Sequence, residues 1–291
     1  MAVKKELSTS RSWQTPYQAP KLTVRALCRL VGYSPQAYYK ASKASDEDQQ
    51  LDNLIVVVVR EIRTSHPKIG ARKLRHMVSQ ELSMHIGRDR IFRVLREADM
   101  LVKRKRRTAH TTDSRHGFRT YTNLVKDIEI NQVDQVWVSD ITYIRVEAGF
   151  MYLSLITDAC SRMVVGYELH PTLSADGCTK ALRMALRNRH GMIDPIHHSD
   201  RGLQYCCKSY INQLKSYNLK VSMTEIDHCY ENAMAERVNG ILKHEYGLYE
   251  TFSDPSKALK AVRQAVRLYN EKRPHMALNY RTPSEVYLKS A

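Results

Sequence analysis

Three carboxylates in this chain have the spacing and setting of a metal-dependent phosphoryl-transfer site. Asp200 and Glu236 are separated by 35 residues, and Asp140 lies 60 positions before Asp200 within the apolar stretch 136–146. Carboxylates brought together repel one another, so at least one would take up a proton unless cations neutralise them. Oxygen ligands without Cys or His favour Mg²⁺ or Mn²⁺. Two such ions can activate an attacking hydroxyl and stabilise the leaving oxygen of a phosphodiester, so we expect Mg²⁺ (or Mn²⁺), two ions, as the cofactor.

The segments around these acids predict an α/β core that brings them together. Residues 136–146, 150–157 and 162–170 alternate like strands of an antiparallel meander, and a helix over 175–189 precedes a short strand at 195–198. We expect helices over 203–217 and 232–246 and a strand over 220–224. If the fourth strand pairs in parallel beside a central first strand, Asp140 and Asp200 become neighbours where the strand order reverses.

Glu236 should reach this point from a helix. At about 100° per residue, one polar face gathers Asn232, Glu236, Asn239 and Lys243, and the opposite half gathers Met234, Val238, Ile241 and Leu242. We expect the apolar half to pack inward and the polar face to serve the site. Two alternatives stay open: any exposed helix has one polar side, and Asn232 could be only the N-cap.

Other acids and a zinc site fit the pattern less well. Asp158 follows the second strand in a typical turn sequence, and Glu231 points to the other side of its helix. Loops hold Asp194, Glu225 and Asp227. The six cysteines form no CxxC pair. Neighbouring pairs on short strand and helix ends rarely converge tetrahedrally, which argues against zinc at His197, His198, Cys206 and Cys207.

Positive charge is concentrated in the first part of the chain. Residues 1–130 hold 26 Lys and Arg against 13 Asp and Glu, a net charge of +13, whereas residues 131–291 hold 20 against 17, a net charge of +3. This asymmetry predicts that the first part faces a polyanion, most simply nucleic acid. A merely soluble basic surface is the alternative.

The basic part contains two candidate helix-turn-helix units. Thr23 can cap a helix over 24–31, Gly32 supplies a turn, and Ser34 and Pro35 begin a second helix through residue 40. A helix over 46–64 follows, and helices over 70–82 and 88–98 form the second candidate, although any helical hairpin shows such a pattern. The basic residues expected to contact phosphates are Arg72, Lys73, Arg88, Arg90, Arg93 and Arg96.

Five consecutive cations mark the domain boundary: Lys103, Arg104, Lys105, Arg106 and Arg107. We expect this run to lie along DNA, although a charge run can also be a solvated linker. The predicted domains are an arm with the first helix-turn-helix (1–45), a second helical domain (46–102), a basic linker (103–130) and a catalytic core with a C-terminal helical extension (131–291). The absence of a long apolar segment and of an apolar signal core predicts a soluble, intracellular protein.

Several motifs together resemble one family. They are the Asp140, Asp200, Glu236 triad, Asp200-Arg201-Gly202-x-Gln204-Tyr205, Tyr230-Glu231-Asn232-Ala233, Lys243 seven residues after Glu236, and Tyr269-Asn270-x-x-Arg273-Pro274-His275 followed by Leu278, Thr282 and Pro283. This combination, over roughly residues 50–287, resembles the transposases of the IS-three group of bacterial insertion sequences. They are relatives of retroviral integrases with a ribonuclease-H-like fold.

The resemblance implies a DDE transposase that cleaves the terminal inverted repeats and joins the exposed 3′-hydroxyl to target DNA. It implies that the triad binds the metal ions, that Lys243 and Asn239 contact DNA near the scissile phosphate, and that Gly202 allows close backbone approach. The expected partners are the element ends, target DNA, further copies of the chain, and the upstream-frame (OrfA) product or a fusion with it. The alternatives are an integrase, a metal-dependent nuclease, or an inactive DNA-binding regulator.

Overall fold

The computed structural model describes residues 23–103, 118–191, 194–225 and 233–289. The chain divides into two compact units, residues 1–54 and 55–291. The expected N-terminal arm, the cations Arg104, Lys105, Arg106 and Arg107, and the expected cap Asn232 lie outside the described residues.

Two helices follow the predicted N-terminal start signals. Helix α2 (Val24–Leu30) begins where the Thr23 side chain accepts a hydrogen bond from the Ala26 amide. Gly32, at φ 72°, turns the chain into α3 (Pro35–Ser65). The predicted break between helices over 35–40 and 46–64 is wrong, because α3 is continuous. Residues 41–45 contain neither Gly nor Pro, so nothing in them stops a helix.

The second predicted helix pair is confirmed in outline. Helix α4 (Ala71–Glu81) buries Leu74 and Val78, and α5 (Arg88–Glu97) buries Ile91, Val94 and Leu95. Its arginines Arg88 and Arg96 are exposed, as the helical pattern predicts for the face away from the core.

The part of the chain from residue 136 onward is built on a mixed sheet whose order is β3-β2-β1-β4-β5. The strands are β1 (Val136–Val146), β2 (Gly149–Asp158), β3 (Val164–His170), β4 (Ile196–Ser199) and β5 (Lys220–Met223). The first three strands are antiparallel, whereas β4 pairs in parallel with β1. Helix α6 (Ala175–Arg187) makes the crossover that a parallel neighbour requires. This confirms the predicted arrangement of strands around β1.

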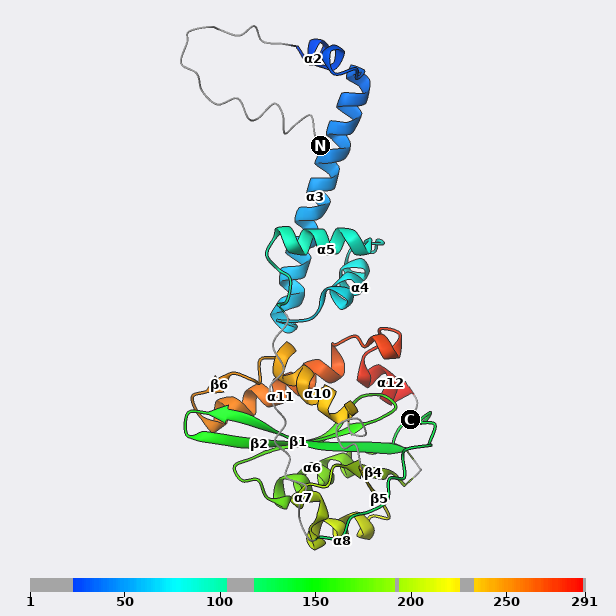
Figure 1. The fold of residues 1–291 in the computed structure, drawn as a ribbon, viewed down its shortest axis with the longest axis vertical. Helices are drawn as coiled ribbons and strands as arrows, with labels where there is room; N and C mark the ends of the chain where they lie inside the picture. The colour runs from blue at the N-terminus through cyan, green and yellow to red at the C-terminus, as the bar shows by residue number, and fades with distance from the viewer. Residues whose placement is uncertain (1–22, 104–117, 192–193, 226–232, 290–291) are drawn as a thin grey trace. The chain divides into compact units, whose positions relative to one another are not determined.

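Helices cover both faces of this sheet (Figure 1). Trp137 and Ile156 pack with α6, α7 (Leu203–Cys206) and α8 (Lys208–Ser216) on one face. On the other face, Ile144 and Leu153 pack with α10 (Ala233–Glu245) and α11 (Pro255–Glu271). Alternate strand residues point to opposite faces, and β1, β2 and β3 each supply both cores.

Other elements differ from the sequence-based expectation. The predicted helix over 203–217 is interrupted at Cys207, whose backbone is extended (φ −68°, ψ 143°). A two-residue strand, β6 (Thr251–Phe252), pairs in parallel with the end of β1. A 3-10 turn (Met276–Leu278) and α12 (Pro283–Lys289) complete the described chain. In the described ranges, no helix has the length and apolar composition needed to cross a membrane.

Candidate active site

Asp140 lies on the central strand at the point where one neighbouring strand ends. Pairing of β1 with β4 stops at Ser139 and Ser199, and pairing with β6 starts only at Arg145. This edge of β1 therefore opens between the two short parallel partners, and Asp140 is the first residue of the opening.

Asp200 is the residue that directly follows β4. Because Ser139 and Ser199 are paired in register, Asp140 and Asp200 occupy neighbouring positions on adjacent strands. The Gly202 amide donates to Asp200 Oδ1 at 3.0 Å. A Cβ atom at residue 202 would lie 3.0 Å from that same oxygen, closer than side chains normally approach. Glycine at this position therefore permits the tight turn behind Asp200.

The electrostatics of Asp140 indicate that the three acids share one region. Its pKa is raised to about 7, mainly because the carboxyl group is buried and secondly because Asp200 is close. Glu236, in the first turn of α10, acts in the same direction. Hydrogen bonds from Asn239 and from the Ile141 amide oppose the shift. The hydrogen bonds to Asp140 are thus too weak to offset its burial and the neighbouring acids, so its ionised form is destabilised.

Asn239 binds Asp140 directly. Its Nδ2 donates to Asp140 Oδ2 at 2.7 Å, while the Ile141 amide donates to Oδ1 at 2.9 Å. Asn239 is only 5% exposed and its Oδ1 is buried without a hydrogen-bond partner in the described structure. The helical periodicity predicts one polar face with Glu236, Asn239 and Lys243. In the structure, Asn239 of this face points toward Asp140 on β1.

Lys243 lies one turn beyond Asn239 on α10. Burial lowers the pKa of Lys243, Asp140 acts to raise it, and Arg145 acts to lower it. The ammonium group is therefore near Asp140 and partly withdrawn from water. A cation in this position can neutralise part of the carboxylate charge or meet an incoming phosphate.

The oxygen-rich character of this region fits a hard divalent cation. Asp140, Asp200 and Glu236 provide carboxylates, and the unpartnered Asn239 Oδ1 adds a buried acceptor beside them. In the part of the chain that the structure describes, no three Asp, Glu, His or Cys side chains are close enough to form a metal site. The three acids thus influence one another's charge, but in this structure their carboxylates are not close enough to bind one metal ion together.

The competing residues have other roles. Asp158 is fully buried and is the last residue of β2 rather than part of the turn. It accepts hydrogen bonds from the Asp134 and Ser161 amides at 2.8 and 2.7 Å, and the Ser161 contact closes the turn that follows the strand. His197 Nε2 bonds to the Ser139 and Tyr210 hydroxyls, and burial lowers its pKa to about 3. These are core interactions, so zinc at the His and Cys pairs gains no support. Glu231 and Asp227 lie outside the described residues.

The predicted DNA-contact residues occupy different settings. Arg72, Arg88 and Lys103 are exposed, whereas Arg90 and Arg93 are partly buried. Arg93 forms an ion pair with Glu97 at 3.3 Å. Lys73 points instead to Glu245, with an N–O distance of 3.5 Å and a side chain that is 16% exposed.

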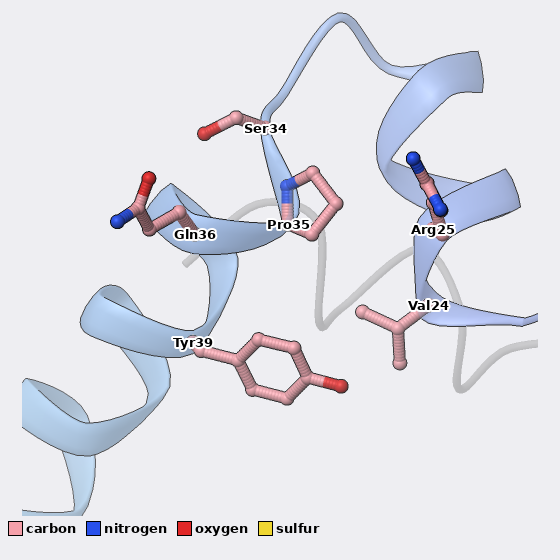
Figure 2. Close-up of a pocket in the computed structure, with 6 residues that line it drawn as sticks. All are labelled: Val24, Arg25, Ser34, Pro35, Gln36 and Tyr39. Carbon is pink, nitrogen blue, oxygen red and sulfur yellow. The ribbon is translucent and has the colours of Figure 1, made fainter.

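A separate hollow lies in the first unit, between α2 and the start of α3. Figure 2 shows Tyr39 and Pro35 facing Val24 and Arg25 across it, with Ser34 and Gln36 completing its lining. None of the predicted site residues contributes to this hollow.

Comparison with known families identifies matches along the core. An integrase core domain family matches residues 130–229, and a second integrase core domain family matches residues 217–283. The 31 kDa protein of insertion element IS600 from Shigella sonnei is 32% identical over 263 residues, which cover 89% of this chain and 96% of that protein. Transposase InsF for insertion sequence IS3A from Escherichia coli (strain K12) is 30% identical over 77% of this chain and 80% of its own length.

Among solved structures, the integrase catalytic core domain of HTLV-2 in complex with magnesium is similar, with a TM-score of 0.43 and 16% identity. The alignment covers 54% of this chain and 97% of that domain.

Proposed function

We propose, since this chain belongs to the family of insertion-sequence transposases, that Asp140, Asp200 and Glu236 are the carboxylates that catalyse its strand transfer. The chain is a DDE transposase with an integrase core of ribonuclease-H-like type, an enzyme that acts on DNA. The strand register supports this assignment most directly, because Ser139 pairs with Ser199 and the next residues are Asp140 and Asp200. The hydrogen bond from Asn239 to Asp140 brings the helix that carries Glu236 to the same place.

The same three residues would hold two Mg²⁺ or Mn²⁺ ions. Bound ions would supply activation of the attacking hydroxyl and neutralisation of charge on the leaving oxygen. The oxygen-only donor set supports hard cations, and the electrostatic cost of ionising Asp140 supports a need for added positive charge.

The surrounding residues would prepare the site for a phosphodiester. The Asn239 amide and the Ile141 amide each bind a different oxygen of Asp140, which fixes the plane of that carboxylate. Lys243 would contact the phosphate backbone near the reacting bond, since its ammonium lies near Asp140 on the same helix as Glu236. Asn239 acts through Asp140 in this arrangement.

The substrate would be the two inverted repeats at the ends of an insertion sequence, together with target DNA. Cleavage would expose a 3′-hydroxyl that attacks the target, and further copies of the chain on the DNA would bring two ends together. The upstream-frame product, separately or as a fusion, would assist recognition of the ends. The chain would act in the cytoplasm, at the nucleoid.

The basic part of the chain would deliver this substrate. Its proposed organisation is an arm with a helix-turn-helix (1–45), a second helical domain (46–102) and a basic linker (103–130), ahead of the catalytic core with its C-terminal extension (131–291). Exposed Arg72, Arg88 and Lys103 support phosphate contacts, and we propose the same role for Arg90, Arg93, Arg104, Lys105, Arg106 and Arg107.

Carboxylate replacement tests the assignment. Asp140→Asn, Asp200→Asn and Glu236→Gln should each lower strand transfer of labelled element ends at least about 1000-fold, since removal of one catalytic partner typically costs this much. Binding of the same DNA should stay within about twofold, because the basic first part is untouched.

Glu147→Gln is the matched control, since Glu147 is an exposed carboxylate in the β1–β2 turn. It should join ends at the normal rate. Joining that persists in any of the three site variants would overturn the assignment of that residue.

A further inference from the structure

Glu245, the last residue of α10, is held by a buried arginine from another part of the chain. Arg273 Nε donates to Glu245 Oε2 at 2.7 Å, and Arg273 Nη2 donates to Oε1 at 2.8 Å. The Arg273 side chain is 3% exposed and that of Glu245 is 19% exposed. This is a two-point ion pair with its partners largely removed from water, a geometry that restricts orientation more strongly than a single contact.

A carboxylate at the end of a helix is locally unfavourable. The C-terminal end carries partial negative charge, which favours basic side chains there. Glu245 sits at this end and nonetheless has a lowered pKa: burial acts to raise it, and the hydrogen bonds and charges of Arg273 and Lys73 outweigh that effect. The ionised Glu245 at the end of this helix is therefore stabilised by Arg273 and Lys73, which are distant in the sequence.

Arg273 belongs to a segment that is fixed to the catalytic sheet. Asn270 accepts from the Val164 amide at 2.9 Å and donates to the Val164 carbonyl at 3.0 Å. The Tyr269 hydroxyl donates to the Arg162 carbonyl at 3.0 Å. Val164 begins β3, which pairs with β2, and β2 pairs with the strand that carries Asp140. The arginine thus has a rigid connection to the same sheet as the site.

The position of Glu245 on α10 determines how the ion pair with Arg273 restrains this helix. Glu245 follows Glu236 by nine residues, which corresponds to about 13 Å along a helix and to the opposite side of it. Asn239 contacts Asp140 on one side of α10, and Arg273 holds the other side at its end. Together the two contacts restrain both the rotation of α10 and its position along its axis.

We propose that Arg273 is a positioning residue for strand transfer: through Glu245 it sets the rotation and depth of α10, and thereby places Glu236 opposite Asp140 and Asp200. The inference rests on the proposed role of Glu236. Lys73 of α4 contributes more weakly, since its single contact with Glu245 is 3.5 Å long. Through Arg273, the Tyr269–His275 segment would have a role in the reaction in addition to packing Tyr269 into the core.

The test uses the full chain with Arg273→Lys, which keeps the charge and loses the two-point geometry. Strand transfer should fall about 10-fold to 100-fold, and the Mn²⁺ concentration for half-maximal rate should rise by a similar factor, as for residues that orient metal ligands. The dissociation constant for DNA should stay within about twofold. In metal-free protein, amide hydrogen exchange in α10 should accelerate while that of β2 and β3 stays unchanged.

Arg267→Lys is the matched control, because Arg267 is exposed on the neighbouring helix α11 and should change none of these values. Glu245→Asp is the second variant. It keeps both charges and shortens the link, so it should reproduce the Arg273→Lys pattern even if Arg273→Lys folds poorly.

The proposal is overturned if folded Arg273→Lys or Glu245→Asp protein joins DNA at the normal rate with an unchanged Mn²⁺ requirement. It is also overturned if the rate falls only in proportion to the folded fraction. Retained joining by Glu236→Gln would instead remove the proposed function, so the two failures are distinguishable.

Discussion

The hydrogen bond from Asn239 to Asp140 helps to decide between two possible roles of Asn239. A side chain that contacts DNA contributes to affinity, whereas one that orients a catalytic carboxylate contributes to rate. Asn239 is nearly buried and donates to Asp140 at 2.7 Å, which favours the second role.

Asn239→Ala should therefore lower the single-turnover rate of strand transfer about 10-fold to 100-fold, the kinetic equivalent of losing a hydrogen bond to a charged group. The dissociation constant for element-end DNA should hardly change. Measuring both quantities on one preparation checks the prediction, and an unchanged rate with weakened DNA binding would contradict it. Asn212→Ala is a suitable control because Asn212 is exposed on α8.

For individual residues, the sequence predicted which side chains belong to the candidate site better than it predicted their contacts. The spacing of Asp140, Asp200 and Glu236 could be read along the chain, and strand order then brought the first two together. The partner of Lys73 could not be read in this way. Glu245 lies 172 residues away, and the helical pattern of residues 71–81 shows only that Lys73 is not in the apolar stripe.

Helix α12 illustrates how a short element can support the catalytic sheet. Its Tyr287 is fully buried, and its hydroxyl donates one hydrogen bond shared by the Asp134 carboxylate, whose two oxygens lie 2.8 and 2.9 Å away. Asp134 also accepts from the Trp137 indole at the start of β1. The helix thus fastens the C-terminal part of the described chain to the strand that carries Asp140.

Tyr287→Phe should lower the free energy of unfolding by about 1–3 kcal/mol, because it removes one donor from a buried carboxylate and keeps the ring. Urea unfolding followed by circular dichroism measures the change. Tyr217→Phe provides the control, since Tyr217 is 46% exposed. Equal stability of the two variants would show that the Tyr287 hydroxyl contributes little.

Elements with a long, regular pattern were predictable, and those defined by distant contacts were not. The strands β1, β2 and β3 and helices α4, α5 and α10 follow the apolar periodicity of their own residues. Strand β6 has only two residues and exists because it pairs with Arg145 and Val146, more than 100 residues earlier in the chain. The break at Cys207 carries no Gly or Pro signal, so no local feature predicted that this helix would be divided.

Across the whole molecule, the excess of positive charge and the proposed catalytic residues occupy different parts of the chain. The first 130 residues carry a net charge of +13, and Asp140, Asp200 and Glu236 all lie beyond them. Most of the binding energy for DNA should therefore come from phosphate contacts outside the catalytic core, with a strong dependence on salt. This expectation rests on composition alone, because net charge does not depend on how the chain folds.

Replacing all five cations of residues 103–107 by Gln should lower the slope of the logarithm of DNA affinity against the logarithm of salt concentration by up to about 4 to 5. Titrations of the full chain between low and physiological salt measure this slope. A variant in which each Lys becomes Arg and each Arg becomes Lys keeps the charge and should keep the slope. If the Gln variant also keeps it, the segment makes no phosphate contacts.

The strand order has a consequence for the time at which the enzyme becomes active during synthesis. Asp140 lies on the central strand, β4 reaches it only after the crossover through α6, and Glu236 follows β5. About 100 residues separate the first acid from the last, which a ribosome adds in roughly 5 to 20 s. The basic first part has left the ribosome by then. If the basic part binds DNA as proposed, a nascent chain would acquire its affinity for DNA before the proposed site is complete, and binding would precede chemistry.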